Sequence, residues 1–199
     1  ALNAAFPCGI LPPDHELVTG TLRLLESNMS PGGLPLNTGW LADGLWVAIA
    51  LDHLAEPHLL RNEGDAAANL FYATLNPGTP LVTWCEERGP EPGSATVTGD
   101  RQHLWTPVAV VRALRDMLLM EQDGALHLAR GTHRAWLASG GPIGITAAPT
   151  HFGKVSYEIR FDPAAKRLAG KAAFPEKGLG APATLHVRLP EELRIAALT

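Results

Sequence analysis

Residues 105–128 read WTPVAVVRALRDMLLMEQDGALHL and contain the change of hydrophobic period on which the fold prediction depends. From Trp105 apolar residues recur every three or four positions, which is the spacing of an amphipathic helix, and this helix is expected to run until Asp123-Gly124. After Gly124 the segment Leu126-His127-Leu128 alternates apolar with polar residues, which is typical of a half-buried strand. The sequence therefore predicts helices before Gly124 and strands after it.

Three further helices are expected upstream, each bounded by residues that start or stop a helix. They cover residues 14–29, 43–54 and 57–75; Asp43 is the expected N-cap of the second, and Pro and Gly residues end the first and the third. The loops 30–42 and 76–104, rich in Gly, Pro, Thr and Trp, join these helices. Loops on a rigid scaffold often carry binding and catalytic groups, so the functional residues are expected in these two loops.

Downstream of Gly124, residues 155–161 and 185–189 repeat the strand alternation, and Gly and Pro residues separate them. One short helix is expected at 133–139. The predicted fold class is α+β with two domains. The first, residues 1–124, consists of antiparallel helical hairpins, and the second, residues 125–199, is a small antiparallel β-sandwich.

Composition excludes several classes of function. The net charge is −4 and the Lys and Arg residues are scattered, so a nucleic-acid partner is not expected. Apolar runs fall far short of the ~20 residues that cross a bilayer, so no membrane partner is expected, and no segment predicts a compartment. Cys8 and Cys85 are too far apart for a CxxC motif, and the eight histidines lack paired-ligand spacing. No metal or other cofactor is predicted.

The loop between residues 77 and 88 places two carboxylates beside an indole and a guanidinium, in the order Trp84, Cys85, Glu86, Glu87 and Arg88. An indole face can stack on the apolar side of a sugar ring, and a carboxylate near it can activate water or donate a proton. The alternative interpretation is a solvated loop with one core tryptophan.

Two other aromatic segments are candidates for the same site. His103 and Trp105 lie at the entry to the last predicted helix, where the alternative is an N-cap followed by a core tryptophan. Trp40 lies near the end of the other long loop, and Asp43 and Trp46 follow it at the start of the second predicted helix. There the alternative is that Trp46 lies on a buried helix and Asp43 only caps it.

Together these segments resemble the C-terminal half of the (α/α)6 barrel of α-L-rhamnosidase-like, six-hairpin inverting glycosidases. Those enzymes have a Trp-Glu loop, followed by Gly-Ser-x-Asn-His-x-Trp at the start of an inner helix. Residues 83–87, TWCEE, are similar to the first element, and residues 99–105, GDRQHLW, are similar to the second. Cys85 interrupts the Trp-Glu pair, and Asp100 and Gln102 stand where the family has Ser and Asn.

The resemblance implies a glycoside hydrolase segment acting on a carbohydrate substrate, with Glu86 or Glu87 as the general base. It implies that Trp84, Arg88, His103, Trp105, Trp40 and Asp43 contribute to sugar binding. It also implies that the general acid lies on N-terminal barrel hairpins of the same protein that are missing from this chain, so that the isolated chain should not turn over substrate.

Two other interpretations stay open. One is a non-catalytic carbohydrate-binding protein that uses the same aromatic loops, and the other is a purely structural helical protein. Glu86 is favoured over Glu87 because residues one apart in an extended loop point to opposite sides, which puts Glu86 on the side of Trp84. Glu87 would then lie near Arg88 or in solvent.

Overall fold

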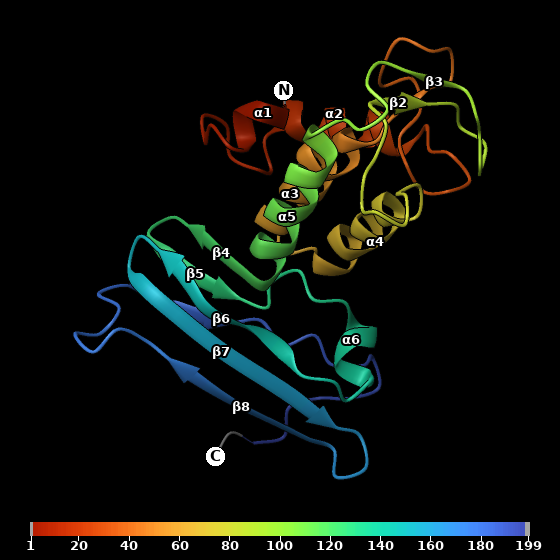
Figure 1. The fold of residues 1–199 in the computed structure, drawn as a ribbon. Coiled ribbons are helices and arrows are strands. Elements are labelled where there is room, and N and C mark those ends of the chain that lie inside the picture. The colour runs from red at the N-terminus through yellow and green to blue at the C-terminus, as the bar shows by residue number, and fades with distance from the viewer. Residues whose placement is uncertain (1, 198–199) are drawn as a thin grey trace. The chain divides into compact units, whose positions relative to one another are not determined.

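A computed structural model describes residues 2–197 of the chain. It divides into two compact units, residues 1–114 and residues 115–199. The division falls within helix α5 (Trp105–Leu118), ten residues before the expected domain boundary at 124. Figure 1 shows the helices of the first unit and the long strands of the second.

The first unit contains short helices and one small sheet. Its elements are α1 (Leu2–Ala5), α2 (Glu16–Glu26), β1 (Leu45–Trp46), the π-helix η1 (Ala50–Ala55), α3 (Glu56–Leu60), α4 (Gly64–Leu75), β2 (Glu87–Arg88), β3 (Val97–Thr98) and the greater part of α5.

Helix α2 shows how the apolar pattern forms the core of this unit. The His15 side chain caps the helix by accepting the N–H of Leu17. Val18 and Leu22 lie four positions apart on the buried face. Helix α4 packs against both η1 and α3, which run on from one another without a break. The apolar core of the unit is therefore built around η1, where Leu51 and Leu54 have no exposed surface.

The expected partial (α/α)6 barrel was wrong. Within residues 2–197 the helices form no barrel of hairpins, and the fold is a mixture of helices and small sheets. The helix expected from Asp43 does not begin there, because Leu45 and Trp46 pair with Arg88 and Glu87 as strands. The last helix stops at Leu118, because residues 119–122 form a strand. Tertiary pairing has overridden local helical periodicity in both places.

The second unit contains two three-stranded sheets. Its elements are β4 (Leu119–Gln122), β5 (Ala125–Leu128), α6 (Arg134–Ala138), β6 (Ile143–Thr150), β7 (Gly153–Asp162), β8 (Arg167–Ala173) and β9 (Ala183–Leu185). One sheet has the order β6-β7-β8 and is antiparallel, with β7 as its long central arrow in Figure 1.

The other sheet has the order β4-β5-β9, and the expectation of a purely antiparallel sandwich was wrong here because β9 pairs with β5 in parallel. Alternate residues of β7 are buried, as the sequence alternation predicts. They share one apolar core with residues of the other sheet, which includes Leu119, Leu126, Leu128, Val155, Tyr157, Ile159 and Phe161.

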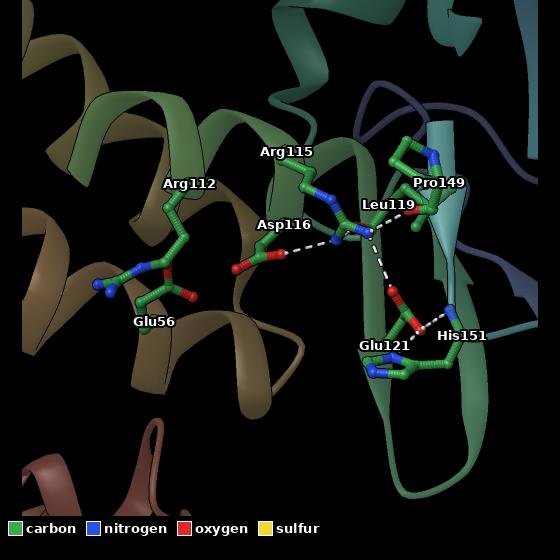
Figure 2. Close-up of polar contacts among 8 residues, drawn as sticks. All are labelled: Glu56, Arg112, Arg115, Asp116, Leu119, Glu121, Pro149 and His151. Atoms are coloured by element: carbon green, nitrogen blue, oxygen red, sulfur yellow. Dashed lines mark hydrogen bonds and ion pairs between the residues drawn. The ribbon is translucent and has the colours of Figure 1, made fainter. Parts of the chain in front are cut away.

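Polar contacts hold the ends of these strands together. Figure 2 shows Arg115 bound to the carboxylates of Asp116 and Glu121, at 3.3 and 2.9 Å, and to the carbonyl oxygens of Leu119 and Pro149. The second oxygen of Glu121 accepts the backbone N–H of His151 at 2.9 Å. Arg115 thus joins the start of β4 to the end of β6. Among residues 2–197, no helix is both long and apolar enough to span a membrane.

Candidate functional site

The segment 84–88 organises the candidate site, because other segments of the first unit pair with it residue by residue. Trp84 forms an isolated antiparallel bridge with His103, and the N–H of Glu86 donates to the carbonyl of Asp100 at 2.8 Å. Glu87 and Arg88 form β2 and pair with Trp46 and Leu45 on one side and with β3 on the other. The loop residues singled out in the sequence are therefore brought together in space.

Three indole rings stack in a row beside this segment. The ring centroids of Trp40 and Trp46 are 5.5 Å apart, and those of Trp46 and Trp105 are 5.2 Å apart with planes inclined by only 14°. The imidazole of His103 lies against Trp105 at 5.0 Å. Trp40 is 67% exposed and Trp105 is 56% exposed, so the two outer indoles present apolar surface to solvent. We call Trp40, Trp46 and Trp105 the aromatic platform.

Glu86 is the carboxylate next to this platform. One of its oxygens, Oε2, accepts the backbone N–H of Asp100 at 3.2 Å. The other, Oε1, lies 3.8 Å from Nε2 of His103, and 15% of the side chain is exposed. Gly99 makes this placement possible, since its φ of 70° suits glycine and a Cβ there would overlap the Glu86 carboxylate. The Glu86 side chain is thus held by a hydrogen bond from the backbone N–H of Asp100, while part of it is exposed to solvent.

Glu87 has a different environment from the one expected near solvent. Its side chain is completely buried. The two carboxylate oxygens accept the backbone N–H groups of Trp40 and Leu41 at 2.9 and 2.8 Å. A buried carboxylate with both oxygens bound to N–H groups of one loop is suited to hold that loop and has no exposed oxygen for a water molecule.

Three other predicted site residues have structural contacts. Trp84 is 1% exposed and its indole N–H donates to the carbonyl of Thr74 at 2.8 Å, so it offers no face for stacking on a sugar. Asp43 occupies a left-handed turn and exchanges hydrogen bonds with Asn37, so it is not a helix cap. Arg88 donates to the carbonyl oxygen of Glu91 at 3.0 Å. Trp84, Asp43 and Arg88 therefore each form hydrogen bonds with other residues of the first unit.

The sequence did not predict the position of Trp46 or the role of three glycines, Gly39, Gly44 and Gly99. Trp46 was expected on a buried helix, whereas it is the middle ring of the aromatic platform. Gly39 and Gly44 stand where a Cβ would overlap the Glu87 carboxylate, as Gly99 does for Glu86. The available signal was Gly39, directly before Trp40, and Gly44, four residues after it, because glycines in a loop can indicate a close approach of another group to the backbone.

Three other properties of the described residues bear on the site. Cys8 and Cys85 are both free thiols, and burial raises the pKa of Cys85. Within residues 2–197 no cluster of three or more His, Cys, Asp and Glu side chains could hold a metal ion. A hollow of about 300 Å³ in the first unit is lined by residues that include Leu34, Leu45, Pro77 and Arg88 and by no ring of the platform. The outer rings of the platform, Trp40 and Trp105, are each more than half exposed.

Comparisons of this chain with protein-family models, with curated proteins and with solved structures give no match. The function of this chain is therefore inferred from the geometry of its own residues and from the sequence resemblance.

Proposed function

We propose that this chain is a carbohydrate-binding segment of an inverting, α-L-rhamnosidase-like glycoside hydrolase, in which Glu86 is the general base. The observation that supports the proposal most directly is the aromatic platform next to Glu86, whose side chain is partly exposed to solvent. Exposed indole faces stack on the apolar face of a pyranose ring, and the carboxylate can then act on a water molecule near the anomeric carbon.

The environments of the two glutamates favour Glu86 as the base. A general base must reach the water whose proton it accepts, and Glu86 retains exposed surface while Glu87 has none. His103 lies between Glu86 and Trp105, so a sugar stacked on Trp105 would lie close to both side chains. Inversion also needs an acidic group about 6.5–9.5 Å from the base, with room for water between them. The resemblance puts that general acid outside the present chain.

A second function, sugar binding without catalysis, uses the same platform. It is favoured by the hydrogen bond that the backbone N–H of Asp100 donates to the Glu86 carboxylate. This bond gives the carboxylate a structural role that needs no catalysis. A purely structural role for the tryptophans has less support, because Trp40 and Trp105 are each more than half exposed and do not fill a core. The carboxylate and the platform can be tested separately.

The first test is sugar binding by residues 1–199. Titration with methyl α-L-rhamnopyranoside and a panel of other methyl pyranosides, followed by tryptophan fluorescence, should reveal saturable binding. Trp105→Ala should weaken it about tenfold, as expected when one aromatic contact of an interface is removed. Trp136→Phe, in the second unit, is the matched control and should leave binding unchanged. Absence of saturation with every sugar in the panel would reject the binding proposal.

The second test concerns catalysis and needs the complete enzyme. Glu86→Gln should lower kcat by about 10²- to 10⁴-fold and leave KM nearly unchanged, because the amide keeps the shape of the carboxylate but cannot accept a proton. Undiminished hydrolysis by the Glu86→Gln enzyme would exclude Glu86 as the base. Sugar binding without any hydrolysis in the complete wild-type protein would favour the non-catalytic alternative.

A further inference from the structure

Glu87 joins two parts of the aromatic platform. It lies opposite Trp46 in the pairing of β1 with β2, so the Trp46 backbone is held against the Glu87 backbone. Its carboxylate also binds the consecutive N–H groups of Trp40 and Leu41. One buried residue thus fixes the backbones that carry two of the three stacked rings.

We propose that Glu87 is a positioning residue whose carboxylate holds the loop 39–44 in place and thereby keeps Trp40 stacked on Trp46. The ligand in this inference rests on the proposed function, whereas the anchoring of the loop rests on hydrogen bonds and burial alone. Glu87 touches no sugar in this scheme. It acts through Trp40, which is the most exposed ring of the platform.

The carboxylate is specifically required because both of its oxygens accept a hydrogen bond from a backbone N–H. A glutamine at this position would offer one acceptor and would turn its NH₂ group toward the other N–H. Two donors facing each other in a buried site leave at least one of them unsatisfied, which is costly. Glu87→Gln should therefore release the loop even though the two side chains have nearly the same shape.

The close packing of the loop supports the same anchor. Gly39 and Gly44 both approach the carboxylate so closely that a Cβ on either would overlap it. Gly44→Ala should displace the loop while Glu87 keeps its charge. It is a second, independent way to break the same contact if Glu87→Gln does not fold.

The experiment uses residues 1–199 and two measurements. Stacked indoles couple their transitions, so the platform should give an exciton couplet in the circular dichroism spectrum. Glu87→Gln should reduce the couplet and should weaken binding of the methyl pyranosides about tenfold. Gly44→Ala should do the same. Glu56→Gln, which changes another fully buried carboxylate of the same unit, is the matched control and should leave couplet and binding intact.

The outcomes separate this inference from the proposed function. If Glu87→Gln and Gly44→Ala both keep the wild-type couplet, Glu87 does not position Trp40 and the inference is overturned. If Glu87→Gln loses sugar binding with an unchanged couplet, Glu87 acts by another route and the inference is again overturned. If the wild-type chain binds no sugar but Glu87→Gln loses the couplet, then Glu87 does hold the loop in place, and only the proposed function is rejected.

Discussion

The indole of Trp46 stacks on the indole of Trp105, with ring centroids 5.2 Å apart and planes inclined by 14°. Trp46 belongs to β1 and Trp105 begins α5, so nearly sixty residues of sequence separate two rings that lie in contact. The same Trp46 ring also contacts Trp40. The stacking of the three rings therefore depends on Trp46, the middle ring.

Replacing that middle ring should uncouple the outer two. In Trp46→Leu the exciton couplet should disappear, because Trp40 and Trp105 each lose their stacked neighbour. Circular dichroism of residues 1–199 measures this directly. Trp136→Phe removes a tryptophan of the second unit and should leave the couplet unchanged. A couplet that survives Trp46→Leu would show that the three rings are not stacked as described.

Arg112 should stabilise the first unit by neutralising a buried carboxylate. Its Nε donates to Glu56, which has no exposed surface, at 3.3 Å, and its Nη2 donates to Asp52 at 2.6 Å. Burial raises the pKa of Asp52 and Arg112 opposes that rise. Arg112→Leu should lower the free energy of unfolding by about 3 kcal/mol, at the lower end of the range for breaking a buried pair because Arg112 is partly exposed.

Urea unfolding monitored by circular dichroism would measure this loss. Adding Glu56→Gln to Arg112→Leu should recover part of the stability, since the second change removes the buried charge that the first left behind. Equal stability of Arg112→Leu and the wild type would contradict a stabilising role for the pair.

Arg115 should stabilise the second unit through its contacts with β4 and β6. Its guanidinium binds the Glu121 carboxylate and the Pro149 carbonyl oxygen from one nitrogen atom, Nη2 (Figure 2). Arg115→Ala should cost about 2 kcal/mol of unfolding free energy, because partly buried charge-assisted bonds are lost together. The exposed pair of Lys171 and Glu158, 3.8 Å apart, supplies the control. Lys171→Ala should cost less than about 0.5 kcal/mol, and a similar cost for both variants would argue against the Arg115 contacts.

The second unit should lose stability in acid through His186. Its Nε2 lies 3.0 Å from Nδ1 of His127. Burial, together with the positive charges of Arg130, His127 and Arg188, lowers the pKa of His186 from 6.5 to about 4. Between these two values the unfolded chain binds a proton at His186 that the folded chain does not, so the free energy of unfolding should fall as the pH falls from 6.5 toward 4.

Urea unfolding of residues 1–199 at a series of pH values would test this dependence. His186→Gln cannot take up the proton, so its stability should fall less steeply over the same range. Identical pH profiles for His186→Gln and the wild type would show that another group causes the acid sensitivity. His127, whose pKa is also lowered by burial, is the first such group to examine.

Local periodicity predicted several elements correctly. The spacing of Val18 and Leu22 predicts α2, and the alternation from Val155 to Phe161 predicts β7. Both patterns arise because one face of the element must be buried, so they are visible in the sequence without any knowledge of partners. The end of α5 at Leu118 could not be predicted from the sequence. Residues 119–122 are apolar enough to continue a helix, and they form a strand only because they pair with β5.

The sequence by itself determined which functional groups this chain carries: tryptophans in or beside loops, a Glu-Glu pair and a histidine at a helix entry. Only the tertiary structure decided what each does. Glu86 and Glu87 are adjacent and identical in type, yet the side chain of Glu86 is partly exposed and that of Glu87 is buried against the N–H groups of Trp40 and Leu41. Neighbours in an extended segment face opposite sides, and what lies on each side is supplied by residues more than ten positions away along the chain.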